Sequence, residues 1–143
     1  MARIYHDADA DLNMLVGQTV AILGYGNQGR AQALNLRDSG VRLIVGSIRD
    51  ESWEQACRDG METVPLAEAA ARGDILLLLL PDEIQREVYE RDIAPNLRAG
   101  RALSFGHGYN IRYQLIRPPA VEDGIQRRFK PLPSRNRQHS RTL

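Results

Sequence analysis

The chain has 143 residues, of which 43% are hydrophobic and 26% are charged, and its formal net charge is +1. This length and balance predict a single globular domain and exclude a disordered chain, a collagen-like repeat and a disulfide scaffold. The single cysteine, Cys57, cannot form an internal bridge, and the longest apolar run, residues 75–80, is far too short to cross a bilayer. With no export signal at its start, the chain is expected to be soluble and cytoplasmic.

Short apolar runs alternate with longer amphipathic ones from residue 19 to residue 105. Because strands that alternate with helices form βαβ units, the pattern predicts an α/β fold with a Rossmann-type, doubly wound, mainly parallel sheet. The run at 75–80 is apolar at every position, which predicts a strand covered on both faces. The predicted strands lie at residues 20–23, 41–45, 62–64, 75–80 and 101–105, and the predicted helices at residues 28–38, 50–58, 66–71 and 83–94.

The spacing of apolar side chains assigns an inward face to two of these helices. Asp82 follows Pro81 and is expected to cap the fourth helix, which is expected to end before Pro95. The residues expected to face the sheet are Ala31, Leu34 and Asn35 in the first helix and Ile84, Val88 and Ile93 in the fourth.

The stretch at residues 24–29 has the spacing of a dinucleotide-binding fingerprint, with Gly24, Gly26 and Gly29 in the three glycine positions. It follows a predicted strand and opens a predicted helix, which is the context that the fingerprint needs. Gly24 makes the tight turn, Gly26 lets the backbone approach a pyrophosphate, and Gly29 lets the helix pack closely on the strand. The alternative is a glycine-rich turn in another kind of α/β protein.

The loop after the second predicted strand is expected to choose between NADP and NAD. That strand does not end in an acid, whereas Arg49 and Ser52 can donate hydrogen bonds to a 2′-phosphate, which favours NADP. Asp50 and Glu51 would repel such a phosphate unless they point away, and the alternative is that they only cap the following helix.

His107 follows the fifth predicted strand and lies between Gly106 and Gly108. Ligands of open α/β sheets bind beyond the carboxyl ends of the strands, so this position points at the cofactor region. The two glycines leave the imidazole little cover, which suits a group that meets a substrate. A structural histidine is the alternative.

Two further features are interpreted as non-functional. Asp7, Asp9 and Asp11 resemble the start of a calcium loop, but Leu12 and Gln18 replace the required glycine and glutamate, so a solvated turn and no metal site are expected. Residues 120–143 contain six basic and two acidic residues and no regular pattern. We expect a basic, disordered tail that binds no nucleic acid, because Phe129 is the only aromatic residue interleaved with its basic residues.

Four motifs, in order, resemble the N-terminal domain of the ketol-acid reductoisomerase (acetohydroxy-acid isomeroreductase) family. They lie between residues 3 and 119 and read Ile4-Tyr-His-Asp-Ala-Asp-Ala-Asp-Leu12, Gly24-Tyr-Gly-Asn-Gln-Gly29, Leu80-Pro-Asp-Glu-Ile-Gln85 and His107-Gly-Tyr-Asn110. The resemblance implies NADPH and magnesium as cofactors. It also implies conversion of 2-acetolactate into 2,3-dihydroxy-isovalerate, a step of branched-chain amino-acid biosynthesis.

The resemblance further implies a role for each matching residue. The loop at residues 46–53 is shorter than in familiar NADPH-using members, which keeps NADH open. The implied roles are contact with the pyrophosphate for Tyr25, Gly26, Asn27 and Gln28, contact with the 2′-phosphate for Arg49 and Ser52, a place beside adenosine and ribose for Asp82, Glu83, Ile84 and Gln85, and the active-site histidine for His107.

After residue 119 the sequence departs from the family pattern. The resemblance implies a following helical domain that supplies the magnesium ligands and grips the acetohydroxy acid, and we do not expect that domain within these 143 residues. Because two divalent ions polarise the reacting oxygens in that chemistry, we expect the chain to bind a dinucleotide but to be inactive alone. The alternatives are a non-catalytic dinucleotide-binding module and a non-functional remnant.

Overall fold

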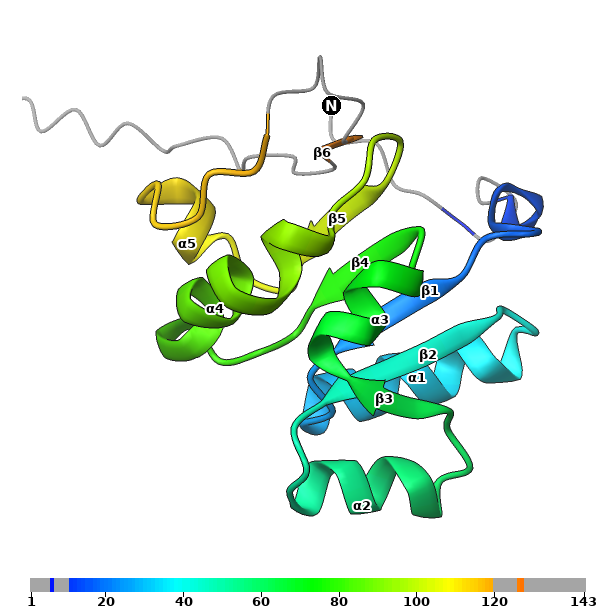
Figure 1. Ribbon diagram of the computed structural model, residues 1–143. Coiled ribbons are helices and arrows are strands. Elements are labelled where there is room, and N and C mark those ends of the chain that lie inside the picture. Colours follow the sequence, from blue (N-terminus) through cyan, green and yellow to red (C-terminus); the bar gives the residue numbers. More distant parts are fainter. Residues whose placement is uncertain (1–5, 7–10, 120–125, 128–143) are drawn as a thin grey trace, which may run out of the picture.

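The computed structural model describes residues 6, 11–119 and 126–127, which form a parallel sheet flanked by helices (Figure 1). The strands are β1 (Val20–Leu23), β2 (Leu43–Ser47), β3 (Thr63–Pro65), β4 (Ile75–Leu78), β5 (Ala102–Phe105) and β6 (Gln126–Arg127). The helices are α1 (Asn27–Asp38), α2 (Glu51–Arg58), α3 (Leu66–Arg72), α4 (Asp82–Val88) and α5 (Tyr109–Arg112), with shorter turns η2 (Leu12–Leu15), η3 (Tyr89–Ile93) and η4 (Ala94–Asn96).

The strand order is β3-β2-β1-β4-β5-β6, and every neighbouring pair is parallel. β1 lies at the centre, where Val20 is opposite Leu43 of β2 on one side and Ile75 of β4 on the other. The chain builds outward from β1 in one direction and then in the other, so the carboxyl ends of β1 and β4 flank the topological switch point. The predicted Rossmann-type α/β fold is confirmed.

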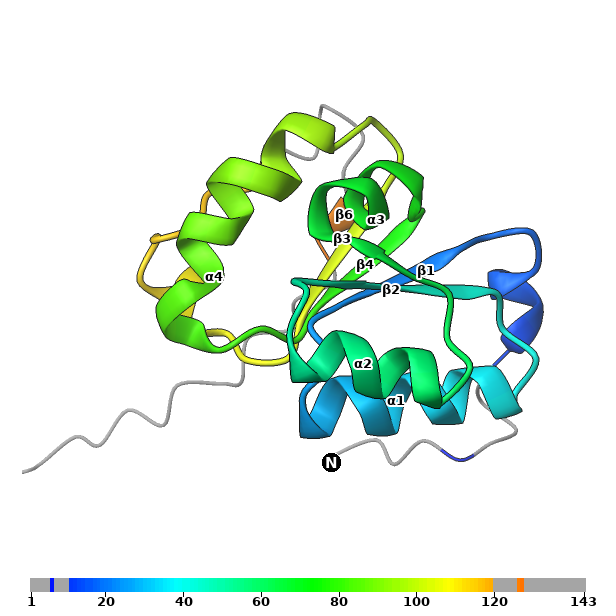
Figure 2. The same cartoon turned by 60° about the horizontal axis from the view of Figure 1, so that its bottom comes forward.

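The sheet has one helical layer on each face, and β1 contributes to the core of both. Helices α1 and α2 lie on one face, and α3 and α4 lie on the other (Figure 2). Val20 and Ile22 belong to the core under α1 and α2, whereas Ala21 and Leu23 belong to the core under α3. All four side chains are buried, which explains why this strand is apolar at every position.

β4 is covered less evenly than its sequence predicts. Leu76 and Leu78 are fully buried against α3 and α4, but Ile75 and Leu77, which point to the other face, are only partly buried. The reason is that α1 makes its main contacts with β1 and β2. The expectation of a strand covered on both faces therefore holds for one face.

The predicted inward faces of two helices need correction. In α1 the buried residues are Gly29 and Ala33, whereas Ala31 and Asn35 are exposed, because Gly29 lets the helix approach the sheet along its own side. In α4, Val88 is buried as expected, but Ile84 is 44% exposed and lines a cavity.

The helical path beyond α4 is longer than predicted. The chain continues from Val88 through η3, a π-helical turn in which Ile93 is buried. It then passes through η4, a 3₁₀ turn that contains Pro95. Proline is tolerated there because it occupies the first turn of η4, where its missing N–H group needs no partner. The helical segment therefore does not end before Pro95.

Two sequence interpretations fall largely outside the described residues. The tail prediction concerns residues 120–143, of which only the two residues of β6 are described, and they pair with β5. Of the three acids that resemble a calcium loop, Asp11 is described, and its carboxylate accepts a hydrogen bond from the Asn13 N–H at the start of η2. No helix in the described part of the chain is long and apolar enough to span a membrane.

Candidate functional site

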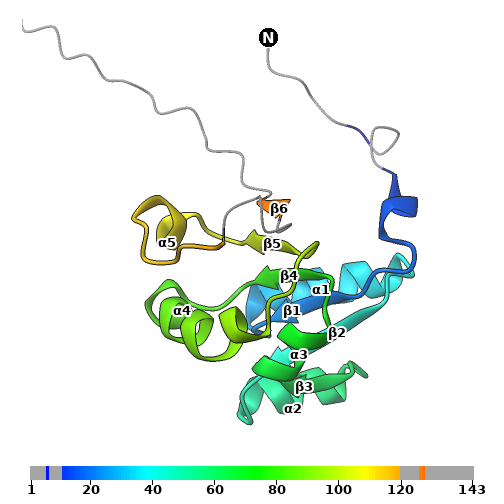
Figure 3. The same cartoon turned by 45° about the horizontal axis from the view of Figure 1, so that its top comes forward.

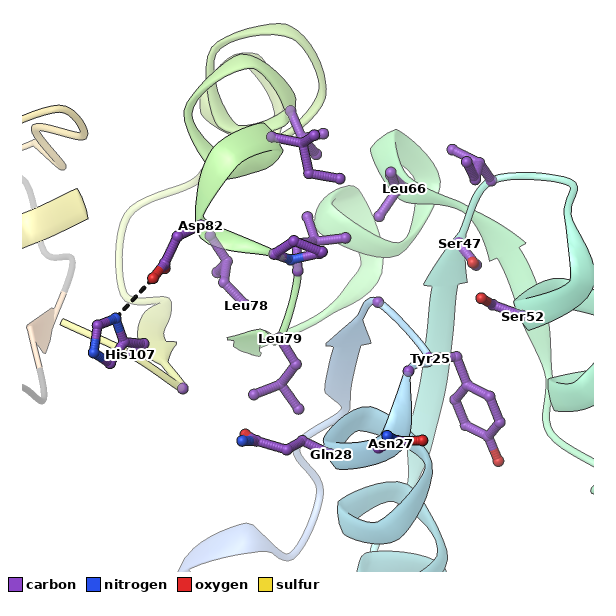
Figure 4. A pocket seen from close by; sticks show the side chains of 18 of the residues that line it. Tyr25, Asn27, Gln28, Ser47, Ser52, Leu66, Leu78, Leu79, Asp82 and His107 are labelled. Atoms are coloured by element: carbon purple, nitrogen blue, oxygen red, sulfur yellow. Dashed lines mark hydrogen bonds and ion pairs between the residues drawn. The ribbon is translucent and has the colours of Figure 1, made fainter. Parts of the chain in front are cut away.

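A cavity of about 650 Å³ opens beyond the carboxyl ends of β1, β2, β4 and β5 (Figure 4). It brings together most of the residues that the sequence analysis selected. Those in its wall are Gly24, Tyr25, Gly26, Asn27, Gln28, Ser52, Asp82, Ile84 and His107. Gly29, Arg49, Glu83 and Gln85 lie near the cavity but do not line it.

The three glycines of the fingerprint meet different surroundings. Gly24 has φ +99°, a backbone conformation that favours glycine, and a Cβ there would lie 3.0 Å from the Leu79 carbonyl oxygen. A Cβ on Gly29 would lie 2.1 Å from the Gly24 carbonyl oxygen, so only glycine lets α1 pack this closely. A Cβ on Gly26 would meet nothing within 4 Å, because Gly26 faces open space at the cavity.

The N-terminus of α1 opens into this cavity without a side-chain cap. Gly26 is its N-cap residue and supplies no side-chain hydrogen bond, and the first turn contains no acid. The first N–H groups of a helix lack intrahelical partners and carry partial positive charge, so this end of a 12-residue helix suits an anion. The open space at Gly26 and the bare helix end together fit the pyrophosphate of a dinucleotide.

Tyr25 offers its backbone, not its phenol, to the cavity. Its side chain is 4% exposed and packs in the core with Ala33 and Ala56, between α1 and α2. The hydroxyl donates a hydrogen bond to Asp59 Oδ2 over 3.0 Å. Burial and this contact with a carboxylate raise the pKa of Tyr25 to about 12.

Asp59 ends α2 and joins the glycine-rich loop to two helices. Its carboxylate accepts hydrogen bonds from Arg30 Nε at 2.6 Å, from Arg30 Nη2 at 3.1 Å and from Gln55 Nε2 at 3.0 Å, in addition to the Tyr25 hydroxyl. The hydrogen bonds from Arg30 come first among the causes that lower the pKa of Asp59 to about 2. The sequence analysis did not select Asp59 as a functional residue. Tyr25 and Arg30 lie 34 and 29 positions away from it, and local patterns do not show that they meet.

The loop between β2 and α2 forms the wall on the side of Ser47. Asp50 lines the cavity and caps α2, where its carboxylate accepts hydrogen bonds from the N–H groups of Ser52 at 3.0 Å and Trp53 at 3.2 Å. Asp50 therefore caps the helix, and Glu51 lies in its first turn. The Arg49 guanidinium lies 5.3 Å from the centre of the Trp53 ring and borders a neighbouring hollow.

At the opposite wall, Asp82 and His107 face each other (Figure 4). His107 Nδ1 lies 2.8 Å from Asp82 Oδ2, and the imidazole is 71% exposed. The sequence analysis expected Asp82 to cap α4, and this expectation is wrong. Pro81 occupies the cap position, and Asp82 lies in the first turn of the helix. Its carboxylate is therefore free to meet the histidine.

The loop after β5 is tied to the start of α4 by buried amides. Asn110, in α5, donates through Nδ2 to the Asp82 carbonyl oxygen and to Gln85 Oε1, each over 3.1 Å, and Gln85 Nε2 donates to the Leu80 carbonyl oxygen over 3.3 Å. α5 follows β5 and contacts α4 (Figure 3). Gln85, expected beside the cofactor, is 1% exposed and lies behind the wall of the cavity.

Several cavity residues carry no polar signal in the sequence. They are the apolar or backbone-presenting residues Ile48, Leu66, Leu78, Leu79, Leu80, Pro81, Val88 and Gly106. An apolar wall with few polar groups is ordinary for a cofactor site. Among the described residues, no group of three or more His, Cys, Asp and Glu side chains lies close enough together to hold a metal ion.

A parallel sheet in this strand order, with a glycine-rich turn and an uncapped helix end at its switch point, defines a dinucleotide-binding α/β domain. A family model described as the NADPH-binding domain of acetohydroxy acid isomeroreductase matches residues 14–125. This match spans more than half of the chain, and the chain belongs to that family. It also reaches beyond residue 119, after which the sequence was expected to depart from the family pattern.

One solved structure supports this assignment, and others share the fold. The chain is similar to an NADH-preferring ketol-acid reductoisomerase from an uncultured archaeon, with 44% identity and a TM-score of 0.83, over 87% of this chain and 39% of that one. A putative oxidoreductase from Jannaschia sp. CCS1 shows 26% identity and a TM-score of 0.66, over 77% and 39%. A 3-hydroxyisobutyrate dehydrogenase from Mycobacterium tuberculosis, at 20% identity and a TM-score of 0.63 over 77% and 38%, shares the fold alone.

Proposed function

We propose that this chain is the cofactor-binding part of a ketol-acid reductoisomerase that acts on 2-acetolactate in branched-chain amino-acid biosynthesis. The chain spans 39% of the length of the archaeal enzyme, so the activity of the whole protein belongs to the proposal. The observation that carries it is one cavity lined by both the glycine-rich loop and His107. When bound, a reduced nicotinamide dinucleotide supplies a hydride.

Within this proposal, the pyrophosphate lies at the bare N-terminus of α1. The backbone at Tyr25 and Gly26 and the polar side chains of Asn27 and Gln28 surround it, because no cap competes for the free N–H groups. Gly29 serves by letting α1 approach the strand. At the other wall, His107 stands where an exposed imidazole can exchange a proton with the substrate.

For the adenosine half, we propose NADPH, with its 2′-phosphate held by Arg49 and Ser52. The description of the family model supports this choice, and Ser52 already lines the cavity. Arg49 borders the adjoining hollow from its place over Trp53, and a rotation of this exposed side chain brings a cation to the phosphate. Asp82 and Ile84 lie along the ribose, with Glu83 and Gln85 behind them in α4.

NADH is the second candidate, and two observations favour it. The archaeal enzyme with 44% identity is described as NADH-preferring. In this chain, the Asp50 carboxylate lines the cavity at the end of β2, where an acid accepts hydrogen bonds from the ribose hydroxyls of NAD and repels a 2′-phosphate.

Calorimetric titration of the 143-residue chain with NADPH and with NADH tests both choices. NADPH is expected to bind more tightly, and Arg49→Ala is expected to weaken NADPH by roughly 10- to 100-fold while changing NADH little, since a charged hydrogen bond contributes about 1.5–3 kcal/mol. Asp50→Ser keeps a helix cap without the charge and is expected to strengthen NADPH and weaken NADH. Tighter NADH binding with no effect of Arg49→Ala would establish the second candidate.

Binding of neither dinucleotide would refute the proposed function itself. If a dinucleotide binds, we expect no oxidation of NADPH by 2-acetolactate with magnesium and the chain alone, because the resemblance assigns the magnesium ligands to a further domain. Turnover by the purified chain, free of host enzyme, would contradict this expectation and show that the chain carries a complete catalytic site.

A further inference from the structure

The Asp82 carboxylate forms a hydrogen bond with the imidazole of His107. In the described part of the chain it makes a single hydrogen bond, to His107 Nδ1 at 2.8 Å, and it does not cap α4. Its place in the first turn of α4 suits a negative charge, because the free N–H groups of that turn carry partial positive charge. An ionised carboxylate accepts hydrogen bonds only, so Nδ1 must be the donor of this bond.

Buried hydrogen bonds hold the loop that carries His107 against the start of α4, which carries Asp82. Asp82 follows β4 and His107 follows β5, and these strands end side by side, with Leu78 opposite Phe105. Asn110 donates from the His107 loop to the Asp82 backbone and to Gln85, and both amide side chains are almost fully buried. Because each amide is hydrogen-bonded inside the fold, the loop cannot slide along α4 without breaking these bonds.

The other ring nitrogen of His107 points away from this pair. Nε2 makes no hydrogen bond to any described residue, and His107 lines the cavity through an exposed ring. The imidazole is stacked against Tyr109, with the ring centres 6.5 Å apart and the planes inclined by 12°. Carboxylate and aromatic ring together restrict the orientation of the imidazole.

From these contacts we propose that Asp82 is a positioning residue, which holds His107 in the Nδ1–H tautomer and leaves Nε2 as the proton acceptor at the cavity. The tautomer of a histidine is set by the hydrogen bond that its other nitrogen makes. Free histidine favours the opposite, Nε2–H tautomer, so the carboxylate reverses the intrinsic preference. The catalytic meaning of this arrangement rests on the proposed function, whereas the tautomer itself does not.

Nitrogen NMR of the ¹⁵N-labelled 143-residue chain, at a pH where the imidazole is neutral, reads the tautomer directly. The chain has three histidines, His6, His107 and His139, and His107→Gln assigns the signals. The original chain is expected to show His107 with its proton on Nδ1. Asp82→Asn retains an acceptor oxygen and is expected to keep this tautomer, whereas Asp82→Ala is expected to return most of the population to Nε2–H.

Glu87→Ala, which removes an exposed carboxylate from the same helix, is the matched control and is expected to leave the tautomer unchanged. A backbone amide spectrum shows whether each variant is folded. If Asp82→Ala does not fold, the tautomer of the original chain and of Asp82→Asn decides the question. An Nε2–H tautomer in the original chain, or an unchanged tautomer in folded Asp82→Ala, would overturn the proposal.

This outcome is separable from that of the proposed function. A chain that binds no dinucleotide but shows the Nδ1–H tautomer refutes the proposed function and retains the positioning role. A chain that binds NADPH tightly but shows the Nε2–H tautomer supports the proposed function and refutes the positioning role. Titration of the same samples with NADPH therefore gives both answers.

Discussion

Gly26 and Gly29 belong to one motif, yet a methyl group is expected to affect stability differently at the two positions. Gly26→Ala places its Cβ in open space, at φ −77°, which alanine readily adopts. We expect unchanged thermal stability but at least about a tenfold loss of dinucleotide affinity, because the methyl group would occupy the space that we propose for the pyrophosphate. Thermal unfolding and calorimetric titration measure the two effects.

Gly29→Ala is the comparison for this prediction. Its Cβ would lie 2.1 Å from a backbone oxygen, so α1 must move and stability must fall together with affinity. Ala31→Ser, on the exposed side of α1, is the control and is expected to change neither quantity. Full dinucleotide affinity in Gly26→Ala would mean that the pyrophosphate does not lie at this turn.

The lowered pKa of Asp59 predicts that the folded chain loses stability in acid. A carboxyl group whose pKa is lower in the folded chain than in the unfolded chain stabilises the fold above its unfolded pKa, and this contribution is lost as the pH falls through the folded pKa. Hydrogen bonds from Arg30 and Tyr25 hold the pKa of Asp59 at about 2, against an ordinary value of 3.8. The melting temperature should therefore fall across this interval.

Asp59→Asn is expected to lower the melting temperature at neutral pH and to flatten its fall between about pH 4 and 2. Asp38→Asn removes a carboxylate that is 70% exposed at the end of α1 and controls for the change in net charge. Melting curves over this pH range measure both variants. An equally steep fall in Asp59→Asn would show that other carboxyl groups govern the acid transition.

At the scale of elements, Arg101 closes the end of α3. Its guanidinium is nearly buried and donates to the carbonyl oxygens of Ala70 and Ala71, in the last turn of α3, and to that of Asn96 over 3.3 Å. The last carbonyl groups of a helix have no intrahelical partner. Arg101 therefore supplies the hydrogen bonds that the end of α3 lacks, at the start of β5.

Arg101→Met removes these bonds while keeping much of the apolar stem, and it is expected to lower the free energy of unfolding by about 1–3 kcal/mol. Arg98→Gln, at an exposed arginine in the same loop, is the matched control and is expected to change it by less than about 0.5 kcal/mol. Urea unfolding measures both. Equal effects of the two variants would contradict a specific role for Arg101.

The order and type of the main elements follow from local pattern. The predicted strand at 20–23 coincides with β1, because four successive buried apolar residues in an extended run leave little alternative. The predicted end of α4 is wrong, because the wider turn η3 and the proline in η4 continue the helical path in a way that apolar spacing does not encode. The exposed Ile84 departs from prediction because a cavity, rather than the sheet, faces it.

At the scale of the whole molecule, stability is expected to decline from the centre of the sheet to its edges. β1 pairs on both sides and has buried residues on both faces, whereas β3, at one edge, pairs with β2 alone. Native-state hydrogen exchange is expected to be slowest in β1 and β2 and faster in β3. Equal protection across the sheet would contradict this gradient.

Dinucleotide binding is expected to stabilise the whole molecule, since the cavity joins residues that follow β1, β2, β4 and β5. At a free NADPH concentration about 100 times the dissociation constant, the free energy of unfolding should rise by about 2.7 kcal/mol. Urea unfolding with and without NADPH measures the change. A local effect confined to the glycine-rich loop would show that binding does not couple the strands.

The sequence by itself determined the α/β class, the central strand and the glycine-rich turn, because hydrophobic periodicity and the conformational freedom of glycine act over a few neighbouring residues. Only the tertiary structure decided that Asp82 meets His107 and that Tyr25 meets Asp59. These partners lie 25 and 34 positions apart, and they meet because parallel strands end side by side and because α1 and α2 lie on the same face of the sheet. Pairing across a sheet depends on strand order and register, which local patterns do not specify.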